Sequence, residues 1–183
     1  MTKSITFFPR KTAIALLVML SACVQSCSEP AEKFFDVSVL NTNTIVDFGT
    51  PILAKHINDQ TTEFPDIPSS KKKGDEAVTY VSNNVMYMEK TLKDIKGLTA
   101  NNDERKAIKE QAIALYELVI PVYKNEYTAY AKLCDAKAPE AQKLEIVKSI
   151  EEKYSSKFVQ QYEALLTKGK AFAKENNINV SWN

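Results

Sequence analysis

Histidine and glycine are scarce in this sequence, and their scarcity excludes several classes of enzyme. The 183 residues contain one histidine, His56, and 4 glycines. A lone histidine provides no second imidazole ligand, and no Glu-x-x-His pair exists, so ferritin-like di-iron chemistry lacks its ligands. The few glycines form neither a phosphate-binding loop nor a Gly-x-Ser-x-Gly nucleophile turn. We therefore predict that the protein is not an enzyme, and that its side chains hold no metal or other cofactor.

Positive charge is also in short supply once the N-terminal segment is set aside. The whole chain has a formal net charge of +1, but Lys3, Arg10 and Lys11 lie in a segment that contains no acid. Removal of that segment leaves a net charge of −2 and a single arginine, Arg105. Nucleic-acid-binding proteins usually cluster arginine and lysine with a strong positive balance. The charge pattern therefore argues against a nucleic-acid partner.

No uncharged apolar run is long enough to span a membrane. The longest, residues 12–20, is about half of the ~20 residues that a membrane-spanning helix requires. Basic residues precede this run, and the small residues Ser21 and Ala22 follow it. A basic start, a short apolar run and small residues at its end are typical of a secretory signal peptide. We predict that residues 1–22 are removed.

The end of this leader, Leu20-Ser21-Ala22-Cys23, resembles the lipobox of bacterial lipoproteins. The resemblance implies that the Cys23 thiol is joined to diacylglycerol, that the chain is cut before Cys23, and that the new amine receives an acyl chain such as palmitate. Membrane lipid is then a partner through Cys23, because several acyl chains hold a protein firmly where one is marginal. Residues 23–30 form a short lipidated tether.

The residue after Cys23 bears on which membrane holds the chain. Val24 stands where many inner-membrane lipoproteins carry an aspartate. By this resemblance we expect anchoring in the outer membrane of the cell envelope, on its periplasmic face or at the cell surface.

Two further cysteines, Cys27 and Cys134, are expected in a compartment that permits disulfides. They either form a disulfide with each other, or Cys134 is free and buried as a small apolar residue. No Cys-x-x-Cys motif occurs, so thioredoxin-like redox chemistry and zinc knuckles are not supported.

The rest of the chain has helical periodicity almost throughout. In residues 75–97, apolar side chains recur at steps of three and four, and Asp75 precedes them as a candidate cap. Pro121 lies inside a longer helical pattern whose phase continues past it, which predicts a kink and not a stop. Residues 31–183 are therefore expected to form one all-α domain, an elongated antiparallel three- or four-helix bundle. The expected helices span residues 31–48, 52–58, 75–97, 102–135 and 138–176.

The main loop of this bundle is expected at residues 60–74. Two prolines, two serines and a glycine interrupt any helix there. We expect Phe64 and Ile67 to pack the loop onto the bundle.

Four tyrosines share one face of the predicted 102–135 helix with Cys134: Tyr116, Tyr123, Tyr127 and Tyr130. Aromatic residues at helical spacing usually pack into a core with their hydroxyls at its rim. The alternative is an inter-helix groove that binds an aromatic, lipid or peptide ligand.

The composition of residues 123–179 is similar to that of helical surface lipoproteins of unknown function from Bacteroidota-type bacteria. It includes the stretches Tyr123-Lys-Asn-Glu-Tyr-Thr-Ala-Tyr130 and Lys174-Glu-Asn-Asn-Ile-Asn179. We predict a non-enzymatic, membrane-anchored helical module that binds a protein or another envelope partner. Two alternatives stay open: a small-ligand carrier or sensor that uses the tyrosine face, and a periplasmic immunity or inhibitor lipoprotein.

Overall fold

The computed structural model describes residues 29–182 and confirms the all-α prediction, with no strand among these residues. Cys23 and the predicted leader lie outside the described residues. The helical elements in chain order are α2 (Ala31–Ser38), the 3₁₀ helix η2 (Leu40–Ile45), α3 (Pro51–Asp59), the 3₁₀ helix η3 (Pro68–Ser70), α4 (Glu76–Gly97), α5 (Asp103–Val122), the π-helix η4 (Tyr123–Tyr127), α6 (Thr128–Asp135), α7 (Glu140–Ile150), the π-helix η5 (Glu151–Ser155) and α8 (Ser156–Glu175).

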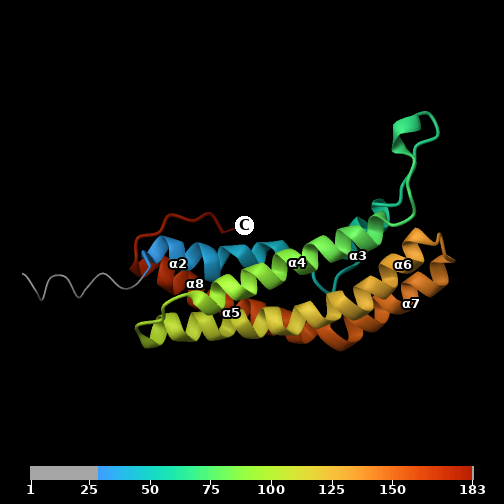
Figure 1. Ribbon diagram of the computed structural model, residues 1–183. Helices are drawn as coiled ribbons and strands as arrows, with labels where there is room; N and C mark the ends of the chain where they lie inside the picture. The colour runs from blue at the N-terminus through green and yellow to red at the C-terminus, as the bar shows by residue number, and fades with distance from the viewer. Residues whose placement is uncertain (1–28, 183) are drawn as a thin grey trace, which may run out of the picture.

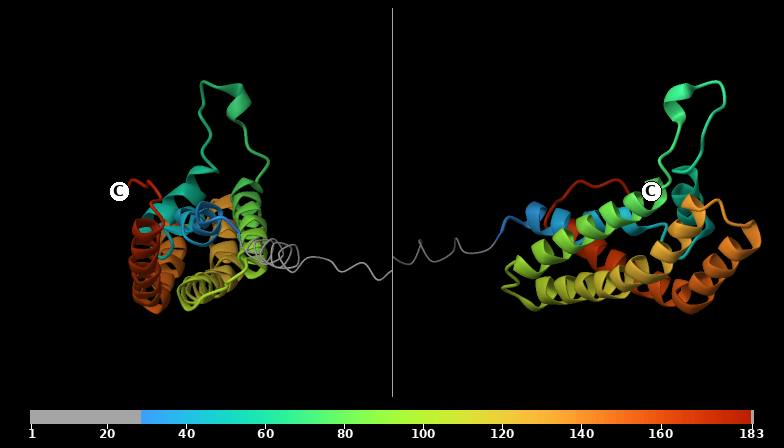
Figure 2. Two further views of the ribbon diagram at one scale, coloured as in Figure 1. Left: turned by 90° about the vertical axis from the view of Figure 1, so that its left-hand side faces the viewer. Right: turned by 45° about the vertical axis from the view of Figure 1, so that its right-hand side comes forward.

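Three long antiparallel arms build an elongated bundle (Figure 1). The first arm is α4, the second is α5–η4–α6, and the third is α7–η5–α8. The shorter α2, η2 and α3 lie along these arms and complete the bundle in the end-on view of Figure 2. Within residues 29–182, no helix is both long and apolar enough to cross a membrane.

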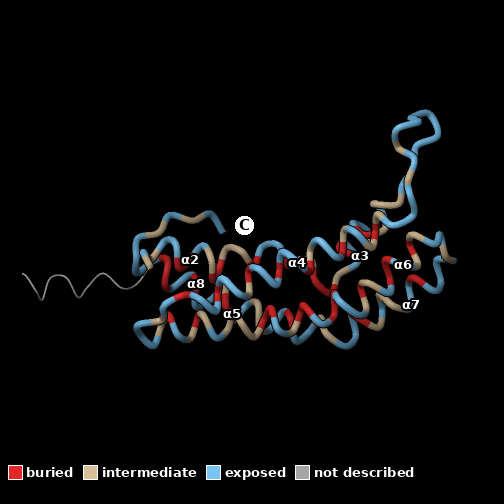
Figure 3. Tube along the Cα trace, viewed as in Figure 1, coloured by how far each residue is buried: buried red, intermediate tan, exposed pale blue. Residues whose placement is uncertain are grey.

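A hydrophobic core runs along the inner faces of the arms (Figure 3). The predicted stripe of α4 supplies Val81, Val85, Met88 and Ile95 to this core. These positions follow the three-and-four spacing of one helix face, so burial of that face explains why this part of the sequence is helical.

The second arm continues through Pro121, as the unbroken phase predicts, and a π-helical turn follows the proline. Proline lacks a backbone N–H and cannot complete the α-helical ladder. Two side chains bond carbonyls here: Asn125 Nδ2 donates to the Pro121 carbonyl at 2.9 Å, and Thr128 Oγ1 donates to the Tyr123 carbonyl at 2.9 Å. These bonds stabilise the irregular turn locally.

The N-terminus of α4 is capped by a distant residue and not by Asp75, which makes no side-chain capping bond. The Asp135 carboxylate at the end of α6 accepts from the backbone N–H groups of Ala77 and Val78, each at 3.0 Å. The expectation for Asp75 was wrong, because tertiary packing brings Asp135 onto the unpaired amides that a helix start always presents.

The first predicted helix is interrupted after α2. The Ser38 hydroxyl donates to the Phe34 carbonyl, and the Thr42 hydroxyl donates to the Val39 carbonyl, so short polar side chains compete for backbone acceptors. The chain tightens into η2 and then turns at Gly49, whose φ of 73° lies in the left-handed region. Residues 31–48 are therefore an α-helix followed by a 3₁₀ helix and turns.

Gly49 lies between the two π-helical turns. Its backbone N–H donates to the Tyr127 hydroxyl of η4 at 3.0 Å. A Cβ added to Gly49 would lie 3.2 Å from the Cα of Ser155 in η5. The close approach of these three segments requires a residue without a side chain at position 49.

Candidate functional site

The four tyrosines of the predicted face lie in the core. Tyr116, Tyr123, Tyr127 and Tyr130 are all buried. Tyr116 donates to the Asn41 carbonyl at 3.0 Å, and Tyr130 donates to the Ala54 carbonyl at 3.1 Å. Burial raises the pKa of both Tyr116 and Tyr127 to about 12. These side chains hold η2 and α3 against the second arm. The tyrosine face is therefore part of the core, which is the first of the two interpretations of the pattern.

The predicted cysteine sites divide between described and undescribed residues. Cys134 is buried on α6 and has no disulfide partner within residues 29–182, and burial raises the pKa of its thiol. Cys23 and Cys27 lie outside the described residues. Lipidation of Cys23 therefore stays a prediction, and pairing of Cys27 with Cys134 stays one of the two alternatives.

His56 lies exposed in the last turn of α3. Within residues 29–182, no group of histidine, cysteine, aspartate and glutamate side chains is placed to hold a metal ion.

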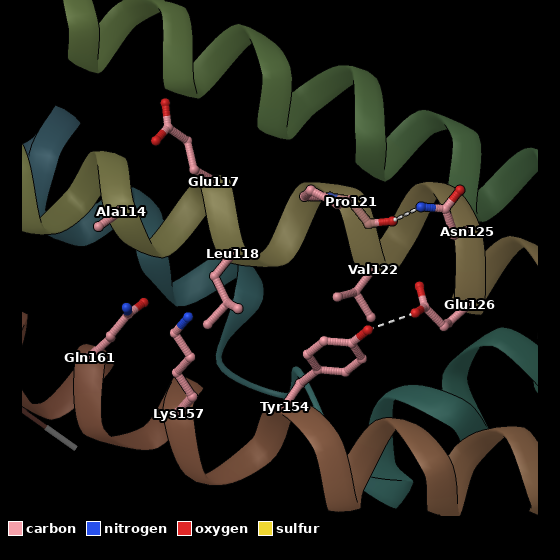
Figure 4. A pocket seen from close by; sticks show the side chains of 10 residues that line it. All are labelled: Ala114, Glu117, Leu118, Pro121, Val122, Asn125, Glu126, Tyr154, Lys157 and Gln161. Atoms are coloured by element: carbon pink, nitrogen blue, oxygen red, sulfur yellow. Dashed lines mark hydrogen bonds between the residues drawn. The ribbon is translucent and has the colours of Figure 1, made fainter.

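A groove of about 430 Å³ lies between the second and third arms, where the two π-helical turns face each other (Figure 4). We call it the Tyr154 groove, because the Tyr154 hydroxyl bridges it to Glu126 Oε1 at 2.8 Å. Lys157 points into it from α8. Glu117, also at its edge, forms an ion pair with Lys96 at 2.7 Å. The lining residues are Ala114, Glu117, Leu118, Pro121, Val122, Asn125, Glu126, Tyr154, Lys157 and Gln161.

Most polar groups of the Tyr154 groove already form contacts within the protein. Glu126 and Glu117 are engaged by protein partners, and Asn125 is bonded to the Pro121 carbonyl. The Gln161 Oε1 atom is buried without a hydrogen-bond partner in the described part of the chain. The groove lining contains no serine, cysteine or histidine, so it lacks the usual nucleophile–base pair.

The most distinctive exposed feature is a loop, residues 60–75, that leaves the body between α3 and α4 (Figures 1 and 2). Phe64 and Ile67 lie in it with 56% and 50% of their surface exposed. The expectation that they pack onto the bundle was wrong. The loop projects away from the helices, so neither side chain reaches the core (Figure 3).

The end of this loop, residues 64–70, is built from two consecutive turns, and we call it the loop tip. The Ile67 N–H donates to the Phe64 carbonyl at 2.9 Å, and the Ser70 N–H donates to the Ile67 carbonyl at 2.9 Å. Pro65 and Pro68 occupy the second position of each turn, where a proline's fixed φ is favourable. Local hydrogen bonds and two prolines therefore give the loop tip a defined shape without core packing.

Ser70 joins the two turns. Its hydroxyl accepts from the Phe64 N–H at 2.8 Å and lies 2.7 Å from the Ile67 carbonyl, to which it donates. This side chain closes the loop tip from within, so that Phe64 and Ile67 remain exposed. A site whose shape is set before binding loses less entropy when a partner binds.

The stem of the loop is held by two carboxylates. Glu63 Oε1 accepts from the Lys72 N–H at 3.1 Å, and Glu76 accepts from the N–H groups of Lys73 and Gly74 at 2.7 and 3.1 Å. The bond from the Lys73 amide is the main reason why the pKa of Glu76 is lowered.

The sequence signal for this ordered loop was present in the two prolines and Ser70, but nothing in the pattern showed that its apolar side chains point outward.

No known protein family, no curated protein and no solved structure matches this chain.

Proposed function

We propose that the protein is a lipid-anchored, non-enzymatic helical module of a bacterial cell envelope that binds a partner through the loop at residues 60–75. The leader and Cys23 supply the anchor, with the outer membrane as the expected location. The bundle supplies a rigid body with a filled core. The loop supplies the contact surface.

The observation that carries this proposal is the exposure of Phe64 and Ile67 on an ordered loop. Two large apolar side chains with no role in the core are held outward by prolines and by Ser70. Connections within compact domains are usually about 4–6 residues long, and much longer ones are often functional; the only regular structure in this loop is the single 3₁₀ turn η3. Binding is the function that an apolar, preshaped tip supports.

Replacement of Cys23 is expected to release the protein from the membrane. Cys23→Ala removes the thiol that receives diacylglycerol, so fatty-acid labelling should be lost and the protein should leave the membrane fraction. The matched control is Cys27→Ala in the same tether, which should keep both the label and the membrane fraction. A Cys23→Ala chain that is still labelled would show that the anchor is elsewhere.

A photocrosslinking amino acid at position 67 tests the binding part of the proposal in cells. The full-length, anchored protein should give an adduct at position 67. The control position is Met86 on α4, which is 65% exposed and should give no comparable adduct. Equal yields at the two positions would contradict binding through the loop.

A further inference from the structure

Positive charge lies directly beside the apolar side chains of the loop tip. Three lysines, residues 71–73, follow the second turn of the tip, and Asp66 is the only acid in residues 64–73. This segment therefore has a net charge of +2. In the part of the chain that the structure describes, none of the three ammonium groups forms an ion pair. The tip thus combines two exposed apolar side chains with three unpaired cations.

The other carboxylates of the loop are already engaged in its stem. Glu63 accepts from the Lys72 N–H at 3.1 Å and lies 3.7 Å from the Lys137 ammonium. Glu76 accepts from two backbone amides at the start of α4. The positive charge of the tip is therefore free to meet an anionic surface outside the protein.

A bilayer that contains anionic lipids matches both properties of the tip. Apolar side chains gain free energy when they leave water. Lysines close to the membrane are attracted by the negative surface potential of anionic headgroups. A lysine side chain is long enough to keep its charge among the headgroups while a neighbouring apolar side chain reaches the acyl chains.

The shape of the molecule allows the loop and the tether to meet one bilayer. The loop projects sideways from the long axis at one end of the bundle, and α2 begins at the other end (Figures 1 and 2). Glu29, just before α2, is fixed to the body of the protein. Its carboxylate accepts from the Thr99 N–H at 3.0 Å, and its carbonyl accepts from Arg105 Nη1 at 2.8 Å. The tether therefore begins at a defined point of the bundle.

The tether and the loop have a similar reach. Residues 24–29 separate Cys23 from α2 almost completely, and six extended residues span at most about 20 Å. The loop at residues 60–75 runs out and back, so its tip stands at most about 27 Å from its base. A bundle that lies along the bilayer can therefore hold acyl chains in it at one end and the loop tip in it at the other.

We propose that the loop tip inserts Phe64 and Ile67 into the surface of an anionic phospholipid bilayer, the same bilayer that holds the acyl chains of Cys23. This inference rests on the proposed function, because it names the partner of that loop. The anchor keeps the tip at a high effective concentration near the bilayer, so a small contact suffices. Lipid chains and a basic patch commonly act together in membrane attachment, since one acyl chain alone is marginal.

The small size of the tip favours a lipid surface over a protein partner. A stable protein interface buries about 800 Å² on each side. The tip exposes two large apolar side chains on a loop that stands clear of the bundle (Figure 3). A bilayer requires no matching shape and accepts single side chains, so this surface is sufficient for it.

Quenching of tryptophan fluorescence by brominated lipids tests the insertion. The anchored protein, purified from membranes, is reconstituted in vesicles of phosphatidylcholine and phosphatidylglycerol with brominated acyl chains. Trp182→Phe removes the only natural tryptophan, and Ile67→Trp then places one in the tip. Its fluorescence should be quenched at least threefold more than that of Leu144→Trp in the same background. Leu144 is the matched control, because it is 56% exposed on α7, away from the loop (Figure 1). Equal quenching at the two positions would overturn the insertion.

The part played by charge is tested with the lysines of the stem. Glutamine at all three positions, 71–73, should reduce the quenching at position 67 at least twofold, and so should vesicles of phosphatidylcholine alone. The matched control is glutamine at Lys93, Lys153 and Lys168, which are exposed on other elements and form no ion pair in the described part of the chain. It removes the same charge and should leave the quenching unchanged. Equal reductions by the two triple variants would contradict a role for the stem lysines.

The molecule captured at position 67 separates this inference from the proposed function. In cells, a photocrosslinker at that position should give an adduct whose added mass is that of a phospholipid. An adduct to a protein would overturn bilayer insertion but leave loop binding intact. Absence of any adduct would overturn both. Fatty-acid labelling of Cys23 is measured separately, so a missing anchor is distinguished from a loop that does not insert.

Discussion

Raising the pH to about 12 is expected to unfold the protein. Burial raises the pKa of Tyr116 and Tyr127 from 10.0 to about 12, and it raises the pKa of Tyr123 and Tyr130 in the same direction. Loss of the phenolic proton in the folded state would leave a negative charge buried in the apolar core, which is unfavourable. The unfolded chain loses those protons more easily, so alkaline pH favours it.

The sign and the window follow from the two pKa values of each tyrosine. A folded pKa above the unfolded one gives stability that is fully present below pH 10 and is lost as the pH rises toward 12. At pH 12, Tyr116 and Tyr127 each remove about 2 kcal/mol of unfolding free energy. The other two tyrosines add to this loss. The sum approaches the roughly 5–15 kcal/mol that stabilises a typical domain.

This transition is measured by following circular dichroism and phenolate absorbance together from about pH 9 to about pH 12, which is roughly the range over which the tyrosines of the unfolded chain ionise. Loss of helix should coincide with ionisation of the buried tyrosines. The control is Tyr116→Phe, which loses the bond to Asn41 but no longer titrates. Its stability should fall less steeply above pH 10 than that of the natural chain. A helical signal that persists at pH 12 with all tyrosines ionised would contradict their burial.

Gly49→Ala is expected to destabilise the fold by roughly 2–5 kcal/mol. A side chain at a positive φ costs about 1–2 kcal/mol, and overpacking costs about 1–3 kcal/mol more. The added Cβ would lie 3.2 Å from the Cα of Ser155, which is backbone and cannot turn aside. The substitution therefore pushes η5 away from the bond between Gly49 and Tyr127.

Gly74→Ala is the matched control for this prediction. Gly74 also has a positive φ, 95°, but no atom lies within 4 Å of an added Cβ. It should lose only the backbone part of the penalty. Chemical denaturation of both variants gives the difference, which measures the close contact with Ser155. Equal losses at the two positions would show that η5 does not pack against Gly49.

The helices were predictable because their information is local. The stripe of α4 and the continuation of the second arm through Pro121 both follow from spacing along the chain. The capping of α4 did not follow, because Asp135 reaches Ala77 from a different helix, through packing that spacing alone does not reveal. The π-helical turn η5 was not predicted either, because residues 151–155 contain neither proline nor glycine to mark an irregular turn.

The candidate site was predictable only in part. The position of the loop followed from its prolines and serines, but the outward direction of Phe64 and Ile67 did not. Apolar identity alone predicts burial, whereas two proline turns and the Ser70 hydroxyl hold these side chains in solvent. The tyrosine face was located correctly by its helical spacing, and the structure places it in the core.

The sharpest single test is intact mass spectrometry of the native protein extracted from membranes. The anchored-module proposal predicts a chain whose first residue is Cys23, with a mass increased by a diacylglyceryl group and an acyl chain. A chain that begins at Met1, or a first residue without acyl groups, would contradict the anchor on which the proposed function depends.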